Sequence, residues 1–469
     1  MSSTTGLVQP TTTTRLRGDS LNFLETIGQS IANVAPTCTP ALNITVVAGM
    51  AGTGTWLAYL IATIGMLFVA GNIGVLARRH PMAGSYFVYI SRTLGPLAGM
   101  MAGWSMIAAY TATAIAITFG SQIFLSDMLR ALGFGSLVPP SWLFNVAFIA
   151  LVWLLAYRDI RISARAGLYL EFTSLGIITI ITGIVLIRHG GIADSTQLDI
   201  THIPGAGVMS ALAFAVFSFV GFESAATLAK ESRDPTRMIP RAVTFSAGFA
   251  GLFFVIIAYA MVVAVGDQAS VLAESASPFA EITRRAGLSW AAAIVYASAL
   301  ISGFACCLAC LNAVSRMMFS MGRYEFIAAW MGSVHKHHQT PHYAISAAAA
   351  SILFICLLLS GLPIVMAFGT TATFGTFGFL VIYLLISLVA PLDLHRAGIL
   401  KPRHALLGGV GVILMAFVIF GSLYPVPEYP YNLLPYLFVA YLLSGAAWYA
   451  ILAARSPSAL LAIQNDLEL

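Results

Sequence analysis

Long apolar runs dominate this chain and limit what it can fold into. Twelve runs are long enough, at about 18 residues or more, to cross the hydrocarbon core of a bilayer as helices. Only 9% of the residues are charged, against about 25% in soluble domains, and 59% are hydrophobic. We therefore predict an all-α polytopic membrane protein with twelve transmembrane helices in the lipid bilayer. The expected spans are 22–47, 55–77, 86–125, 142–157, 164–187, 207–229, 240–265, 289–321, 342–360, 364–391, 405–424 and 433–454.

The distribution of Lys and Arg predicts how these spans are oriented. With the N-terminus inside, 19 of the 23 Lys and Arg residues fall on the cytoplasmic side. The other four are Arg130, Arg188, Arg284 and Arg285. Because cytoplasmic loops carry the excess of basic residues, we expect a multi-pass protein of the cell (inner or plasma) membrane with both termini cytoplasmic. The net charge of +5 then belongs to these loops, and no nucleic-acid partner is expected.

Two spans contain residues that interrupt a helix. The first carries Asn33 and Pro36 at its centre, and Pro36 lacks a backbone N–H and disfavours helical angles at the residue before it. The sixth contains Gly221, followed two residues later by the carboxylate Glu223. A glycine weakens a helix at its position, and an ionisable residue within a membrane span indicates a functional site.

The two interruptions open successive five-span sets, spans 1–5 and 6–10. Paired breaks at corresponding positions indicate inverted repeats with a substrate site at the membrane midplane. In such a site the N–H groups of a half-helix bind a carboxylate, and unpaired carbonyls accept hydrogen bonds from an ammonium group. The alternative is that Pro36 only kinks a packed helix.

Four motifs follow one another along the chain. They are His80-Pro-Met-Ala-Gly-Ser-Tyr-Phe-Val-Tyr89, Phe217-Ser-Phe-Val-Gly-Phe-Glu223 with Lys230–Pro235, Asn312-Ala-Val-Ser-Arg316 with Gly322-Arg323, and Val334-His335 through Thr340-Pro341. With these motifs in this order, the chain resembles the amino acid–polyamine–organocation (APC) transporters over nearly its whole length. The second motif is similar to the unwound sixth helix of that family.

The resemblance implies a fold and a domain organisation. The fold is a 5+5 inverted-repeat (LeuT-like) core with discontinuous helices 1 and 6, plus two peripheral helices. Residues 21–391 would form this core, with repeats at about 21–190 and 205–391, and residues 392–455 would form helices 11 and 12. Residues 1–20 and 456–469 are expected to be cytoplasmic tails, the first of them disordered.

The resemblance also implies which residues hold the substrate and control its access. Phe217 corresponds to a gating aromatic residue, and Glu223 to a glutamate linked to proton-dependent release in an arginine–agmatine antiporter of the family. The chain departs from many relatives at position 174, where serine replaces a lysine, and it lacks a Gly-x-Gly at the first break. The implied substrate-binding residues are Asn33, Val34, Ala35, Pro36, Thr37, Phe217, Ser218, Val220 and Gly221.

Glu223 and Glu171 are the two carboxylates well inside the predicted spans. Burial favours the protonated form of a carboxylate, so either residue can couple transport to protons, or it can be a hydrogen-bonded structural group. Ser174 and Ser315 form a candidate cation site, although serines in membrane helices more often bond to their own backbone. Protons are therefore the expected coupling ion, Na⁺ is less expected, and no cofactor is expected.

Two further clusters resemble metal sites. Residues 335–338 read His-Lys-His-His, but consecutive histidines rarely converge on one ion, so we predict a solvated cytoplasmic loop. Cys306, Cys307 and Cys310 lie deep in an apolar helix, where we expect them to pack rather than bind metal.

The predicted function is secondary active transport of amino acids by alternating access, linked to protons. The nearer alternatives are a polyamine or amine carrier, in which Glu223 and Glu171 bind the cation directly, and an amino acid exchanger. The more distant alternative is a membrane-embedded transferase, which would need catalytic residues clustered at one membrane face. Side-chain specificity is expected to depend on spans three, six, eight and ten together.

Overall fold

The structure is a computed structural model that describes residues 16, 18, 20–80, 85–190, 194–266, 268–275 and 277–455. These residues form helices joined by short loops, and their one strand-like pairing is an isolated parallel bridge between Leu21 and Ser232. Most of the predicted tails, 1–20 and 456–469, and residues 81–84 of the first motif lie outside the described residues.

Long helices make up most of the fold, and several are broken or flanked by shorter ones. They are α1 (Phe23–Val34), α2 (Cys38–Ala51), α3 (Thr55–Arg79), α4 (Ser85–Leu94), α5 (Pro96–Ala131), α6 (Ser141–Arg158), α7 (Ile160–His189), α9 (Gly205–Phe217), α10 (Pro235–Ala264), α13 (Ala291–Arg323), α14 (His342–Leu359), α15 (Ile364–Arg396), α16 (Pro402–Leu423) and α17 (Leu434–Arg455). The short helices are α8 (Ser195–Leu198), α11 (Ala269–Ala273) and α12 (Pro278–Arg285), and a 3₁₀ helix, η4, runs over Ser224–Glu231.

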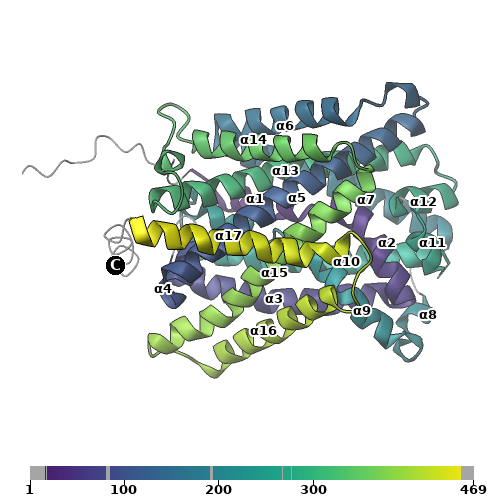
Figure 1. Cartoon of the computed structure of the whole chain (residues 1–469). Coiled ribbons are helices and arrows are strands. Elements are labelled where there is room, and N and C mark those ends of the chain that lie inside the picture. The colour runs from purple at the N-terminus through teal and green to yellow at the C-terminus, as the bar shows by residue number, and fades with distance from the viewer. Residues whose placement is uncertain are drawn as a thin grey trace, which may run out of the picture.

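The long helices lie roughly side by side in one bundle (Figure 1). The short helices α8, α11 and α12 gather at one end of the bundle, and the C-terminal end of α17 lies at the other. Helix α5 is central and packs against both α13 and α15, while α3 packs along α10. Helices α16 and α17 are the least buried of the long apolar helices, with 22% and 11% of their most apolar windows buried.

The described residues contain ten helical segments long and apolar enough to cross a membrane, so the chain is a multi-pass membrane protein. This count is two below the twelve spans predicted, for two reasons. The second half of the first span runs on through a short turn into α3, and together they form one 42-residue segment. Helix α9 in the sixth span stops after 13 residues, which is too short to cross alone.

The predicted third span, 86–125, is not one helix. It divides into α4 and α5 at Gly95, whose φ of +93° takes the chain out of helical geometry. Pro96 then begins α5, where its missing N–H costs no helical hydrogen bond. Gly-Pro signals a helix boundary, and the apolar residues on both sides masked that signal.

Candidate functional site

The first break separates α1 from α2 by three residues. Helix α1 ends at Val34, Ala35 adopts a left-handed conformation with φ of +50°, and α2 begins at Cys38. Pro36 lies between them and has no N–H to continue the helical ladder. The Thr39 hydroxyl donates a 2.7 Å hydrogen bond to the carbonyl of Val34, which is one of the acceptors freed by the break.

The second break follows α9, which ends at Phe217. A run of turns leads to η4, and Gly221 within it has a φ of +99°, a conformation that favours glycine. The side chain of Ser218 is buried beneath this break and contacts Asn43 at 3.1 Å and Tyr59 at 3.2 Å. The end of α9 is thereby attached to α2 and α3.

The two breaks touch each other through Gly221 and Asn33. A Cβ on Gly221 would lie 2.8 Å from Cγ of Asn33 and 2.9 Å from its carbonyl oxygen, so no larger residue fits there without movement. Asn33 is fixed from the other side by α13, where the Cys306 thiol lies 3.1 Å from its carbonyl oxygen and the Cys310 thiol 2.9 Å from Oδ1. These two cysteines, expected only to pack, also hydrogen-bond to the first break.

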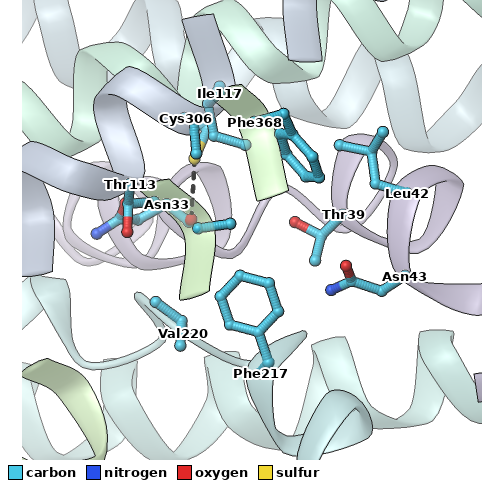
Figure 2. A pocket seen from close by; sticks show the side chains of 12 residues that line it. Asn33, Thr39, Leu42, Asn43, Thr113, Ile117, Phe217, Val220, Cys306 and Phe368 are labelled. Carbon is cyan, nitrogen blue, oxygen red and sulfur yellow. Dashed lines mark hydrogen bonds between the residues drawn. The ribbon is translucent and has the colours of Figure 1, made fainter. Parts of the chain in front are cut away.

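A pocket lies beside this contact (Figure 2). The open space is small, about 30 Å³, which suits water rather than a substrate molecule. In the part of the chain that the structure describes, no Lys, Arg, His, Asp or Glu lines it. The lining comes from α1, α2, α5, α9 with the second break, α13 and α15, which includes the predicted third, sixth, eighth and tenth spans. The lining residues are Asn33, Thr39, Leu42, Asn43, Thr113, Ala116, Ile117, Phe217, Val220, Cys306, Phe368 and Ala372.

Glu223 lies just beyond the second break and is fully buried among tyrosines. Tyr110 of α5 donates to its Oε1 at 2.7 Å, and Tyr383 of α15 donates to its Oε2 at 2.5 Å. The N–H of Gly221 lies 3.2 Å from the same Oε2, and Tyr86 of α4 donates to the backbone carbonyl of Glu223 at 2.7 Å. The carboxyl group therefore joins the second break to α5 and α15 without a basic partner among the described residues.

Glu171 of α7 is also fully buried and lies next to the first break. Its Oε1 accepts a 3.0 Å hydrogen bond from Ser302 of α13, and the Ser302 hydroxyl accepts the backbone N–H of Cys38 at 3.3 Å. The carboxyl group also meets the backbone N–H of Thr37 in a weaker contact, while Oε2 has no well-formed hydrogen bond. The two buried carboxylates thus lie one at each break.

Ser174 and Ser315 are far apart. Ser174 donates a 2.8 Å hydrogen bond to the carbonyl of Ser298, and the two hydroxyls lie 2.9 Å apart. Ser315 lies 17 residues beyond Ser298 on the continuous helix α13, which is about 25 Å at 1.5 Å per residue. It donates instead to the carbonyl of Asn312 at 3.0 Å. These two serines therefore do not converge on one ion in this conformation.

The comparisons with known proteins all indicate one family. Residues 26–454 match the family model described as amino acid permease. The chain belongs to the amino acid permease family. The permease is 30% identical over 376 residues to an uncharacterized transporter of Mycobacterium tuberculosis, with 79% of each chain covered.

Two relatives of the permease carry substrate names. The low-affinity putrescine importer PlaP of Escherichia coli is 29% identical over 356 residues, covering 73% of the permease and 74% of PlaP. The branched-chain amino acid permease BcaP of Bacillus subtilis is 25% identical over 311 residues, covering 63% and 65%. The family and these relatives are transporters, so the permease is a transporter and not the membrane-embedded transferase considered above.

A buried ion pair joins α13 to the end of η4. Arg316 of α13 binds Glu231 at the end of η4 through two contacts of 2.8 and 2.9 Å, and both side chains are almost wholly buried. The carbonyl of Glu231 accepts the N–H groups of Ser20 and Leu21 at 2.9 and 3.0 Å. Arg165 binds Glu25 at 2.6 Å nearby. The motifs contained Arg316 and Glu231, but no local spacing indicated that they pair.

Within and after the loop of residues 335–338, the rings of His335, His338 and His342 lie around Tyr157 of α6. The ring centroids of His335 and His338 are 4.6 Å apart, and those of His335 and His342 are 5.1 Å apart. Burial and the neighbouring His338 and His337 lower the pKa of His335. Nδ1 of His335 accepts the backbone N–H groups of His337 and His338, which folds the loop on itself.

Proposed function

We propose that the permease is a secondary active transporter that moves an amino acid, or the corresponding amine, by alternating access. The observation that carries this proposal is the contact between the two helix breaks, Asn33 against Gly221, beside a pocket with aromatic and amide lining. Broken helices are tolerated at membrane depth where they line a cavity, and substrate sites of transporters are built from such breaks.

We further propose twelve membrane crossings, with α1–α2 forming the first and α9–η4 the sixth. Residues 21–391 would then form a ten-helix core of two inverted, LeuT-like repeats, at about 21–190 and 205–391. Helices α16 and α17 would be peripheral, and their low burial supports this. The Lys and Arg distribution supports cytoplasmic termini in the cell membrane.

The residues proposed to contact the substrate lie at the two breaks. At the second break, carbonyls near Phe217 and Val220 would accept hydrogen bonds from the substrate's ammonium group, and the ring of Phe217 would cover it. At the first break, Asn33 through Thr37 would complete the site. The relatives named for putrescine and for branched-chain amino acids support a small substrate that carries an ammonium group.

Glu223 is the proposed proton-coupling residue. Its carboxyl group bonds at once to the second break, to α5 and to α15. A change in its protonation state therefore changes contacts among three elements around the pocket. Such a change can favour one access state over the other, as coupling requires.

Uptake into liposomes tests the proposed function. Purified permease reconstituted in liposomes should accumulate a labelled amino acid or amine when an inward proton gradient is imposed. Empty liposomes, and permease liposomes after the gradient is collapsed, provide the controls. Failure to take up or exchange any member of a panel of amino acids and amines, under any imposed gradient, would contradict the proposal.

A further inference from the structure

Most backbone N–H groups at the first break have partners within the break or in α1. The N–H of Val34 lies within α1, and the N–H of Ala35 donates to the carbonyls of Ile31 and Ala32. Pro36 and Pro40 have no N–H to offer. Thr39 donates to the carbonyl of Ala35 at 2.9 Å. Only Thr37 and Cys38 remain, and these are the N–H groups at the start of α2, where a helix attracts negative charge.

Glu171 and Ser302 lie at the start of α2, beside those two N–H groups. The N–H of Cys38 donates to the Ser302 hydroxyl at 3.3 Å, and this hydroxyl donates on to Oε1 of Glu171 at 3.0 Å. The N–H of Thr37 lies near the same carboxyl group, without a well-formed hydrogen bond among the described residues. A carboxylate of the protein thus stands where the sequence led us to expect the carboxylate of the substrate.

The second break offers the opposite chemistry. Among the described residues, the carbonyl oxygens of Ser218 and Val220 accept no hydrogen bond, although they belong to a buried segment. Buried carbonyls are almost always paired, so these two are available to a hydrogen-bond donor. Val220 also lines the pocket. An ammonium group is the donor that unwound carbonyls bind in transporters.

The pocket itself has little to hold a carboxylate. Among the described residues, no basic side chain lines it. Their one unpaired lining group that can only donate a hydrogen bond is the side-chain N–H₂ of Asn33, which is neutral. Thr113 is unpaired as well, but a hydroxyl can donate or accept. The aromatic rings of Phe217 and Phe368, by contrast, suit a cation.

We propose that Glu171, acting through Ser302 and the start of α2, replaces the carboxylate of a substrate, so that the site selects an aliphatic amine over an α-amino acid. The inference rests on the proposed transport function and names the substrate class within it. Glu171 is a specificity-determining residue in this account, because it acts through α2 and does not line the pocket. Among the described residues, Glu223 is the second buried carboxyl group without a basic partner. When it is ionised, its charge also favours a cation.

Matched pairs that differ only by a carboxylate test this proposal in reconstituted wild-type permease. The pairs are putrescine and ornithine, cadaverine and lysine, and isobutylamine and valine. Each member competes against the labelled compound that liposomes take up best. We expect the amine of at least one pair to compete about tenfold or more better than its amino acid, a difference of about 1.4 kcal/mol.

The variants Glu171→Gln and Ser302→Ala test the mechanism of selection. Each loosens the protein's own contacts with the N–H groups of Cys38 or Thr37, so the ratio between amine and amino acid should fall at least about threefold, or about 0.7 kcal/mol. Glu428→Gln, in an exposed loop, is the matched control and should leave the ratio unchanged. The measured ratio does not depend on expression level, and Ser302→Ala serves if the Glu171 variant fails to fold.

Three outcomes decide between the proposals. A wild-type permease that prefers the amino acid in every pair overturns this inference and leaves the proposed transport function intact. An amine preference that both variants retain unchanged overturns the role of Glu171. If no compound competes or is taken up, the proposed function itself fails.

Discussion

Tyr383 donates a 2.5 Å hydrogen bond to Oε2 of Glu223, from a helix that lies 160 residues further along the chain. Tyr110 binds the other carboxylate oxygen at 2.7 Å. Both phenols are fully buried, so the carboxyl group is held by donors of fixed position away from bulk water. Glu223 therefore links the second break by hydrogen bonds to α5 and α15, two helices that line the pocket.

Replacing Glu223 should uncouple transport from protons. Glu223→Gln keeps the shape of the side chain but cannot release a proton. If Glu223 carries the coupling proton, as we propose, stimulation of uptake by an inward proton gradient should fall about tenfold or more. Uptake into liposomes at several external pH values measures this effect. Glu428→Gln should keep the wild-type pH profile. An unchanged pH profile in Glu223→Gln would show that the coupling residue lies elsewhere.

Breaking the ion pair of Arg316 and Glu231 should destabilise the permease. Arg316→Met leaves a buried carboxylate without its partner, which costs about 3–5 kcal/mol. Thermal unfolding in detergent should therefore begin at a clearly lower temperature than in the wild type. The control is Arg284→Met, which breaks a solvent-exposed contact with Glu281 and should change little.

A second variant separates the charge effect from the loss of packing. In Arg316→Met with Glu231→Leu, neither charge of the pair remains to be buried without a partner, and part of the lost stability should return. If the single variant unfolds at the wild-type temperature, the pair does not stabilise the fold as described.

Uptake should not depend on sodium. Ser174 is engaged with Ser298, and Ser315 lies about 25 Å away along α13, so the two serines do not form a cation site together. Initial uptake rates in sodium and in potassium buffers of equal ionic strength should agree. Sodium dependence that disappears in Ser174→Ala would contradict this prediction and restore a sodium site at Ser174.

Local backbone chemistry is what made the two breaks visible in the sequence. Pro36 lacks an N–H, and Gly221 reaches a φ of +99° that larger residues avoid. Both effects act within a few residues of the chain, so the residues themselves reveal them. The same reasoning applied to Gly95 and Pro96 would have divided the third predicted span.

The partners of the buried carboxylates could not be predicted in the same way. Ser302 lies 131 residues from Glu171, and Tyr110 lies 113 residues from Glu223. Which residues meet across such separations depends on how whole helices pack, and one sequence carries no local signal for it. The sequence therefore predicted two carboxylates inside the membrane spans, with Glu223 beside the second break, but it did not place Glu171 at the first break or show whether the start of α2 is free. That open point is the one on which the substrate class depends.

We assign the transport site to the two breaks because Gly221 and Asn33 contact each other there. Gly221→Ala introduces a Cβ 2.8 Å from Asn33 at a φ that alanine avoids, a strain of about 1–3 kcal/mol. Gly176→Ala is the matched control, because Gly176 lies on the exposed face of α7 with no atom within 4 Å of the added Cβ.

Binding of a labelled substrate to purified wild type and to both variants is the most direct measurement. The account predicts that Gly221→Ala weakens binding by about tenfold or more, while Gly176→Ala binds as the wild type does. Wild-type affinity in a folded Gly221→Ala protein would contradict the assignment of the site to the two breaks.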